Sequence, residues 1–477
     1  MKKLFRIVLF VLIGILSMTS TGLAEEDRVV EEDRSIPIPV TYEVKKVVLN
    51  LESYGTLNQP EDLFLDSRGF LYVADTGNNR VLKMSGEGRV LESITGPEEK
   101  PFSGPRGVYV DEEGALYVAD SGNKRVIRRS ASGEYDKVYV KPESNLLSKD
   151  FVFDPQKIYM SSTGLLYALK GISFLTIDEA NQFQGYVGAK EVGFDLRRML
   201  IRIFATRAQR DRIAKVLPVS YTNFVIGPDG FVYATVGNTE KGQIRKINSV
   251  GKNLYPDLAF GDRMIMRDRQ FIEPSFADIA VDERGVISVI DKATTSVYQY
   301  DQEGNMLLAF GEMGEKKGGF LSPSSIVTNG EGNLYISDSQ ANNIQIFEPT
   351  AFTKAVHQAV SLYNNGEYQN AMEYWQQVLA IDANYSLAHK GMGKLYYKEE
   401  RWKESMEEYR LAEDKAGYSK AFQEYRHQMF RRYFGWVFFG FIGIVAVCCL
   451  LVIRLKKKSN RVANVLFYGK EADELWK

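Results

Sequence analysis

The chain has 477 residues, enough for about three domains. Its 44% hydrophobic and 25% charged residues are typical of a folded protein and exclude a disordered or collagen-like chain. Its 60 basic and 61 acidic side chains give a net charge of −1, without the basic excess typical of nucleic-acid-binding proteins, so we expect no nucleic-acid partner.

The N-terminus has the composition of an export signal. Three basic residues among the first six precede the apolar run 7–18, and small residues then lead to Ala24. This order predicts a signal peptide over 1–24 that is cut after Ala24. An uncleaved anchor is the alternative, although the apolar run is shorter than the roughly 20 residues that cross a bilayer. We expect the acidic segment 25–40 to be a linker.

Repeats fill the chain between residues 41 and 350. The sequence PEDLFLDSRGFLYVADTGNNRVLKM, from Pro60, returns 45 residues later as PRGVYVDEEGALYVADSGNKRVIRR. Each copy has an alternating strand, a turn with Asp and Gly, an apolar strand, a polar turn and a third strand. Strand-rich units of about 45 residues predict a β-propeller rather than a helical solenoid. The six copies begin at or centre on Pro60, Pro105, Gly164, Gly230, Pro274 and Pro323.

These copies resemble the NHL-repeat family, in which Pro, an alternating strand, Asp-x-x-Gly, LYVAD, Asn and Arg follow one another. The resemblance implies an all-β, six-bladed propeller over 41–350. The last copy has three predicted strands, and a lone strand at 41–51 precedes the first copy, so we expect this strand to complete the last blade and close the ring. The repeated Asp75, Asn79 and Arg80 could line a ligand site, but their recurrence favours a role in bracing turns and neighbouring blades.

The third and fourth copies are separated by about 20 residues more than the repeat requires. The excess lies near 192–216, where apolar residues occur at helical spacing and basic residues outnumber acidic ones. It predicts a helix that either packs over a propeller face or touches an anionic membrane or a partner.

A helical pattern with a period of 34 residues begins at about residue 351. Two helix–turn–helix units within 351–433 resemble tetratricopeptide (TPR) repeats and are followed by a closing helix. In that family the first helix of each pair lines a concave groove, so the resemblance implies a groove for an acidic protein segment. A solvated lysine stripe is the alternative, although like charges four residues apart are mildly unfavourable. The candidate groove residues are Tyr363, Asn364, Lys390, Lys394, Tyr397 and Lys398.

A second apolar run, 434–453, contains no charged residue and is long enough to cross a bilayer. Basic residues follow it at once, so it predicts a transmembrane helix with a cytoplasmic tail, 454–477. A buried core helix is the alternative. We expect a single-pass protein of a bacterial cell membrane with most of its chain outside the cytoplasm and with Cys448 and Cys449 in the lipid.

Two functions fit these features. Residues 41–348 contain no His and no Cys, and the chain has no nucleophile or phosphate-binding motif. We therefore expect no enzyme and no cofactor, but a scaffold that binds protein partners, including another membrane protein, as an accessory subunit of an envelope or transport complex. The alternative is a propeller enzyme of the lactonase, lyase or hydrolase type, with calcium bound by carboxylates.

Overall fold

The computed structural model describes two compact units, divided between residues 387 and 388. The predicted signal peptide, 1–24, and the predicted basic helix near 192–216 lie outside the described residues. The structure describes residues 27–473 except 32–33, 145–146, 148–149, 172, 188–219, 264 and 268–269.

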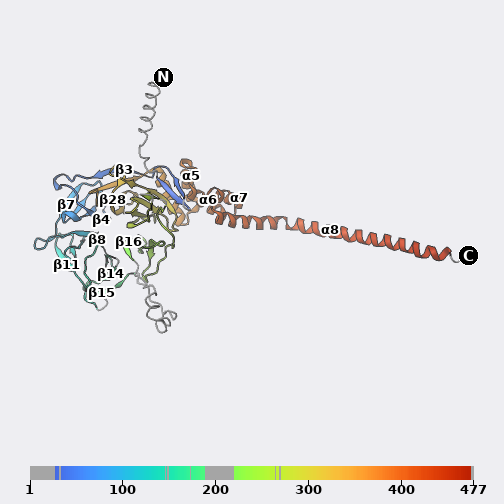
Figure 1. Ribbon diagram of the computed structural model, residues 1–477, viewed down its shortest axis with the longest axis horizontal. Coiled ribbons are helices and arrows are strands. Elements are labelled where there is room, and N and C mark those ends of the chain that lie inside the picture. The colour runs from blue at the N-terminus through green and yellow to red at the C-terminus, as the bar shows by residue number, and fades with distance from the viewer. Residues whose placement is uncertain are drawn as a thin grey trace, which may run out of the picture. The chain divides into compact units, whose positions relative to one another are not determined.

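Six antiparallel sheets form the blades of a β-propeller in the first unit (Figure 1). Blade 1 comprises β4 (Pro60–Leu65), β5 (Leu71–Asp75), β6 (Arg80–Met84) and β7 (Val90–Ile94). Blade 2 comprises β8 (Pro105–Val110), β9 (Leu116–Asp120), β10 (Arg125–Arg129) and β11 (Tyr135–Tyr139). Blade 3 comprises β12 (Lys157–Met160), β13 (Leu166–Lys170), β14 (Ser173–Ile177) and β15 (Phe183–Tyr186). Blade 4 comprises β16 (Tyr221–Ile226), β17 (Val232–Val236) and β18 (Ile244–Ile247). Blade 5 comprises β21 (Phe276–Val281), β22 (Ile287–Asp291), β23 (Ser296–Tyr300) and β24 (Met306–Phe310). Blade 6 comprises β27 (Pro323–Thr328), β28 (Leu334–Asp338) and β29 (Asn343–Pro349) together with β3 (Tyr42–Val48).

The propeller core lies between blades. The innermost strands β4, β8, β12, β16, β21 and β27 contact one another in turn around a ring. Buried apolar clusters join blade 1 to blade 2, blade 2 to blade 3, and so on to blades 4 and 5, and a further cluster joins blade 6 to blade 1. Because both faces of a blade are covered by neighbours, the second strand of several blades is buried along its whole length, as in β5.

The ring is closed by a strand from the N-terminal side of the repeats. β3 pairs antiparallel with β29, with Val48 opposite Ile344. Val48 is buried in the cluster that also holds Leu63 of blade 1. The prediction that the strand before the first copy completes the last blade is confirmed.

Part of the segment predicted as a linker, 25–40, forms a hairpin. β1 (Arg28–Glu31) and β2 (Arg34–Pro37) pair antiparallel, and β1 also pairs with β24, which extends blade 5. The Arg28 guanidinium makes a buried ion pair with Asp262 at 2.9 Å. The partner lies 234 residues away, so the local acidic composition gives no sign of this contact.

In the described part of the first unit, two helices follow the propeller. α4 (Ala351–Asn364) begins at Thr350, whose hydroxyl accepts a hydrogen bond from the Thr353 amide, and α5 (Tyr368–Ile381) packs against α4. The Thr353 hydroxyl donates to the Thr41 carbonyl at 2.6 Å. The buried face of α4 is thus fixed to the chain just before the closing strand.

His357 extends this attachment. Its Nε2 lies 2.7 Å from Oε1 of Gln299, whose amide nitrogen donates to the hydroxyls of Tyr42 and Ser288 at 3.0 and 2.8 Å. Because the Gln299 oxygen is the acceptor, Nε2 of His357 carries the proton. Burial and, to a smaller extent, the nearby Arg284 charge together lower the pKa of His357 to about 3, so the ring stays neutral.

The second unit is helical. It contains most of α6 (Ser386–Lys398), followed by α7 (Trp402–Leu411) and α8 (Lys415–Asp473). A Cβ on Gly393 would lie 2.9 Å from the Tyr409 ring, so glycine permits the close packing of α6 and α7. The helical segment is confirmed, whereas its assignment to the TPR family stays a prediction.

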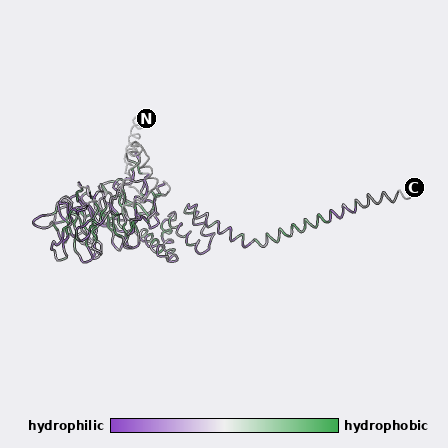
Figure 2. The backbone as a smooth tube through the Cα atoms, turned by 90° about the horizontal axis from the view of Figure 1, so that it is seen from below, coloured by the Kyte–Doolittle hydropathy of each residue, from purple (hydrophilic) through white to green (hydrophobic). Residues whose placement is uncertain are grey.

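The apolar run 434–453 lies within α8, which is green over this stretch in Figure 2. Within the described residues, α8 is the one helix long and apolar enough to cross a membrane. Short elements complete the structure: the strand pairs β19 (Met266–Arg267) with β20 (Gln270–Phe271) and β25 (Glu312–Met313) with β26 (Gly319–Phe320), and the 3-10 turns Glu52–Tyr54 and Thr76–Asn78.

Replacing His357 with Leu should lower the melting temperature of the full chain in detergent at pH 7, because the buried Gln299 oxygen loses its donor, a cost of about 1–3 kcal/mol. A histidine whose pKa is lowered on folding contributes stability that is present above its unfolded pKa of 6.5 and is lost as the pH falls toward 3. The variant should therefore lose less stability than the parent between pH 7 and pH 4.

The matched control is His427→Leu, because the His427 side chain is 54% exposed. Thermal melts followed by circular dichroism measure both effects. A His357→Leu variant with the melting temperature and pH profile of the parent would contradict the role assigned to this contact.

Candidate functional site in the central channel

The central channel is lined by the innermost strand of every blade, so each blade contributes an equivalent residue at each level. Five of these strands have a register shift at the equivalent position, for example between Pro60 and Asp62 in β4. Such a bulge turns two consecutive residues toward the channel, as with Glu61 and Asp62.

Three levels follow one another along the channel. The polar level consists of Glu61, Arg106, Gln156, Thr222, Ala277 and Ser324. The charged level consists of the next residue of each strand, Asp62, Gly107, Lys157, Asn223, Asp278 and Ser325. The apolar level lies two residues further on and consists of Phe64, Tyr109, Tyr159, Val225, Ala280 and Val327.

The charged level holds an ion pair that crosses between blades. Nζ of Lys157, in blade 3, lies 2.6 Å from Oδ1 of Asp62, in blade 1. The blade between them presents Gly107 at this level, so no side chain stands between the two groups. A Cβ on Gly107 would also lie 2.6 Å from the Gln156 carbonyl oxygen, so this position requires glycine.

Asp278 completes the charged group from the other side of the ring. Its carboxylate accepts a hydrogen bond from the Ser325 hydroxyl at 2.6 Å and from the Ile326 amide at 2.9 Å. Asp62 likewise accepts from the Val108 amide at 2.9 Å. Asp62 is 2% exposed and Asp278 is fully buried, so both carboxylates are held by donors of the adjacent blade.

Burial raises the pKa of Asp62 to about 6; the Asp278 charge also raises it, and the Lys157 ammonium opposes both. For Lys157, burial favours the neutral amine, but Asp278 and Asp62 outweigh burial and raise its pKa. The charged level therefore combines Lys157, which stays protonated, with Asp62, whose pKa is raised toward neutral pH. This pairing is suited to proton transfer.

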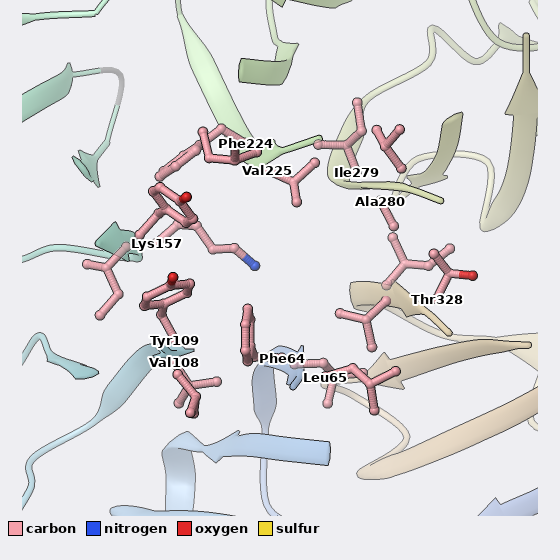
Figure 3. Close-up of a pocket in the computed structure, with 18 of the residues that line it drawn as sticks. Phe64, Leu65, Val108, Tyr109, Lys157, Phe224, Val225, Ile279, Ala280 and Thr328 are labelled. Atoms are coloured by element: carbon pink, nitrogen blue, oxygen red, sulfur yellow. The ribbon is translucent and has the colours of Figure 1, made fainter. Parts of the chain in front are cut away.

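Two cavities reach the charged level. On the side of the polar level, a cavity of about 280 Å³ is bordered by Arg106, Lys292 and the Asp62–Lys157 pair. On the side of the apolar level, a cavity of about 320 Å³ is bordered by all six blades. Lys157 borders both cavities, and Figure 3 shows its amine in the middle of the second.

The charged level does not fit the calcium of the alternative enzyme hypothesis. Calcium takes six to eight oxygen ligands, whereas here the Lys157 ammonium already bonds Asp62 and faces the charge of Asp278. In the described part of the chain, no group of three or more His, Cys, Asp or Glu side chains could hold a metal ion.

The repeated turn residues brace the blades, as predicted. The buried Asp75 carboxylate accepts hydrogen bonds from the Asn58 amide at 2.8 Å and from Arg80 Nε at 2.7 Å. The Asn79 side chain accepts from the amide of Gly104, in the loop before blade 2, at 2.7 Å. These contacts hold the loop that enters a blade to the turn of the same blade or of the preceding one.

The predicted partner-binding residues fall in two units. Tyr363 and Asn364 end α4 in the first unit. The remaining four lie on α6 in the second unit, namely Lys390, Lys394, Tyr397 and Lys398. A groove that unites the two sets stays a prediction.

Sequence reasoning missed Asp62, Lys157 and Asp278. It looked for residues shared by the copies, whereas these three occupy one repeat position with different side chains. A comparison of that position across all six copies, after correction for the bulge, would have found them.

Comparison with protein families matches residues 57–84 and 102–128 to the NHL repeat. No curated protein matches the chain. Among solved structures, a streptogramin B lyase shares 14% identity over 60% of this chain and 78% of its own, with a TM-score of 0.39. A catalytically inactive virginiamycin B lyase from Staphylococcus aureus with quinupristin shares 12% identity over 66% and 84%, with a TM-score of 0.40. A gluconolactonase-like protein shares 14% identity over 68% and 98%, with a TM-score of 0.42.

These findings contradict the prediction that the chain is not an enzyme, because the similar solved propellers are named as lyases and as a gluconolactonase-like protein. The prediction rested on the absence of His and Cys from residues 41–348, but the channel offers Asp62 and Lys157 as titratable groups without either. The low identities transfer no activity to this chain. The chain carries NHL repeats in the first two blades of a six-bladed propeller.

Proposed function

We propose that this protein is a membrane-anchored propeller enzyme of the lactonase, lyase or hydrolase type that acts by acid–base catalysis at the charged level of its channel. One observation carries the proposal: the buried Asp62 carboxyl has a pKa raised to about 6 and lies 2.6 Å from the ammonium of Lys157, which borders both cavities.

The chemistry follows from these two groups. Ionised Asp62 takes a proton from a water molecule that adds to an ester or lactone carbonyl, and the resulting oxyanion accepts a hydrogen bond from Lys157. The leaving oxygen then takes the proton from Asp62 as the carbon–oxygen bond breaks. Asp278 contributes by holding the lysine in its ammonium form.

A binding role for the second unit is a further candidate. α6 carries Lys390, Lys394 and Lys398 at intervals of four residues on one helix. Three basic side chains on one helix are complementary in charge to an acidic protein segment. We propose that this row docks an acidic segment of another membrane protein, with α8 as the membrane anchor, the propeller outside and the basic tail in the cytoplasm.

Asp62→Asn should lower kcat on lactones or esters by about 10²–10⁴-fold, the usual contribution of a general acid or base, and remove the limb of the pH–rate profile near pH 6. Full-length protein in nanodiscs, assayed on a panel of lactones and simple esters, measures this. Asp301→Asn is the matched control, because Asp301 is also a buried carboxyl with a raised pKa but holds a turn outside the channel. A parent without turnover, or a folded Asp62→Asn variant with full activity, would contradict the proposal.

The proposed topology predicts that protease added to spheroplasts digests the propeller and spares an epitope on the tail after residue 453. The basic residues that follow the apolar run set this orientation. Digestion of the tail with protection of the propeller would reverse the topology.

Replacing the three α6 lysines with glutamate should abolish crosslinks to a membrane partner while the helical circular dichroism signal is kept, because none of the three side chains is buried: Lys398 is exposed, and Lys390 and Lys394 are half-buried. Crosslinking in intact membranes at low salt, where charge complementarity is strongest, measures the loss. Unchanged crosslinks from a folded triple variant would exclude this docking site.

A further inference from the structure

The apolar level both packs between blades and lines a cavity. Five of its residues contact the buried clusters between blades, but each is only half-buried and also borders the cavity, namely Phe64, Tyr109, Tyr159, Val225 and Val327. The cavity of about 320 Å³ lies at the lower end of the range typical of small-molecule sites. A ring of apolar side chains contributed by every blade is suited to the body of an apolar ligand.

The two halves of this ring differ in shape. Blades 1 to 3 contribute aromatic rings, with centroids 5.0 Å apart for Phe64 and Tyr109 and 4.9 Å apart for Tyr109 and Tyr159. Blades 4 to 6 contribute the small aliphatic side chains Val225, Ala280 and Val327. The planes of these rings are inclined by 68° and 60°, so the aromatic side of the cavity is angular and the opposite side is lined by smaller groups. Together the two sides fit a compact apolar group.

The floor of the cavity adds one polar requirement. Figure 3 shows the Lys157 amine directed into the space between Phe64, Tyr109 and Val225. The ammonium has three N–H donors, of which one bonds Asp62 at 2.6 Å, so a ligand atom that accepts a hydrogen bond fits at this position.

The charges at the charged level favour a ligand whose hydrogen-bond acceptor is neutral. Asp62 and Asp278 carry two negative charges when ionised, against one positive charge on Lys157, so an anionic head group is disfavoured. The carboxylates of Asp62 and Asp278 already accept hydrogen bonds from backbone amides. Lys157 is therefore the group that donates a hydrogen bond to the ligand. A carbonyl oxygen is neutral and accepts without donating.

We infer that the apolar level of the channel binds a neutral carbonyl compound with a compact apolar body, its carbonyl oxygen on Nζ of Lys157. Aromatic or alkyl ketones, esters and lactones belong to this class. The inference rests on the proposed function, because it names the substrate class of the Asp62–Lys157 centre. It places the apolar part of the substrate against the apolar level and its reacting carbon beside Asp62.

The test uses two probes of nearly equal shape. 4′-Fluoroacetophenone carries a carbonyl oxygen where 4-fluoro-α-methylstyrene carries a methylene group. Fluorine NMR titrations with the full chain in nanodiscs, referenced to empty nanodiscs, should show the ketone binding about tenfold more tightly, which is the value of one hydrogen bond. Lys157→Met should remove this preference by weakening the ketone alone.

A cavity-filling variant tests the site without disturbing the ion pair. Val327→Trp should abolish specific binding of both probes, and Ala280→Phe serves the same purpose if the first variant fails to fold. Val138→Trp is the matched control, because Val138 is 46% exposed on β11, outside the channel. Equal affinity of the parent for both probes, or unchanged ketone binding in a folded cavity-filled variant, would overturn the inference.

The outcomes separate the two proposals. A parent that binds the ketone through Lys157 but has no turnover on esters or lactones would contradict the proposed catalysis and support the binding site. Turnover that survives Val327→Trp would contradict the inference and leave the Asp62 mechanism standing.

Discussion

The structure depends on the closure of the propeller ring. Every blade is apolar on both faces, so a blade at an open end would leave one face in water, at a cost of about 25 cal/mol for each Å² exposed. The antiparallel pairing of β3 with β29 removes both open ends at once, because it joins the strand just before the first copy to the last copy. The attachment of α4 through His357 and Thr353 lies beside this junction and fixes the chain on both sides of it.

Closure also explains how the channel acquires buried charge. Taking Asp62 and Lys157 out of water costs several kcal/mol for each ion unless the pair is close and its remaining sites are hydrogen-bonded. The closed ring supplies those donors from adjacent blades, as the Val108 amide does for Asp62 and the Ser325 hydroxyl does for Asp278. An apolar level of the kind found two residues further on would close the ring without this cost. The charged level is therefore better explained by function than by stability.

The sequence was sufficient to predict the architecture, because the features that build it recur. The six copies, the bracing of turns by Asp75 and the closing strand follow from periodicity and from the count of strands in each copy. The hairpin β1–β2 could not be predicted, since Arg28 finds its carboxylate 234 residues away. The Asp62–Lys157 pair could not be predicted either, because it joins two blades separated by a glycine and depends on a bulge that turns Asp62 to the channel.

The same contrast separates structural from functional positions within each repeat. Asp75 and Asp120 are equivalent residues with equivalent contacts, and each closes the turn of its own blade. The charged level instead places Asp62, Lys157 and Asp278 at equivalent positions with unlike side chains. A repeat preserves what every blade needs, and an asymmetric ligand requires that the blades differ where they meet around it. In a propeller made of near-identical units, the channel residues that differ between blades are consequently the best candidates for ligand binding and catalysis.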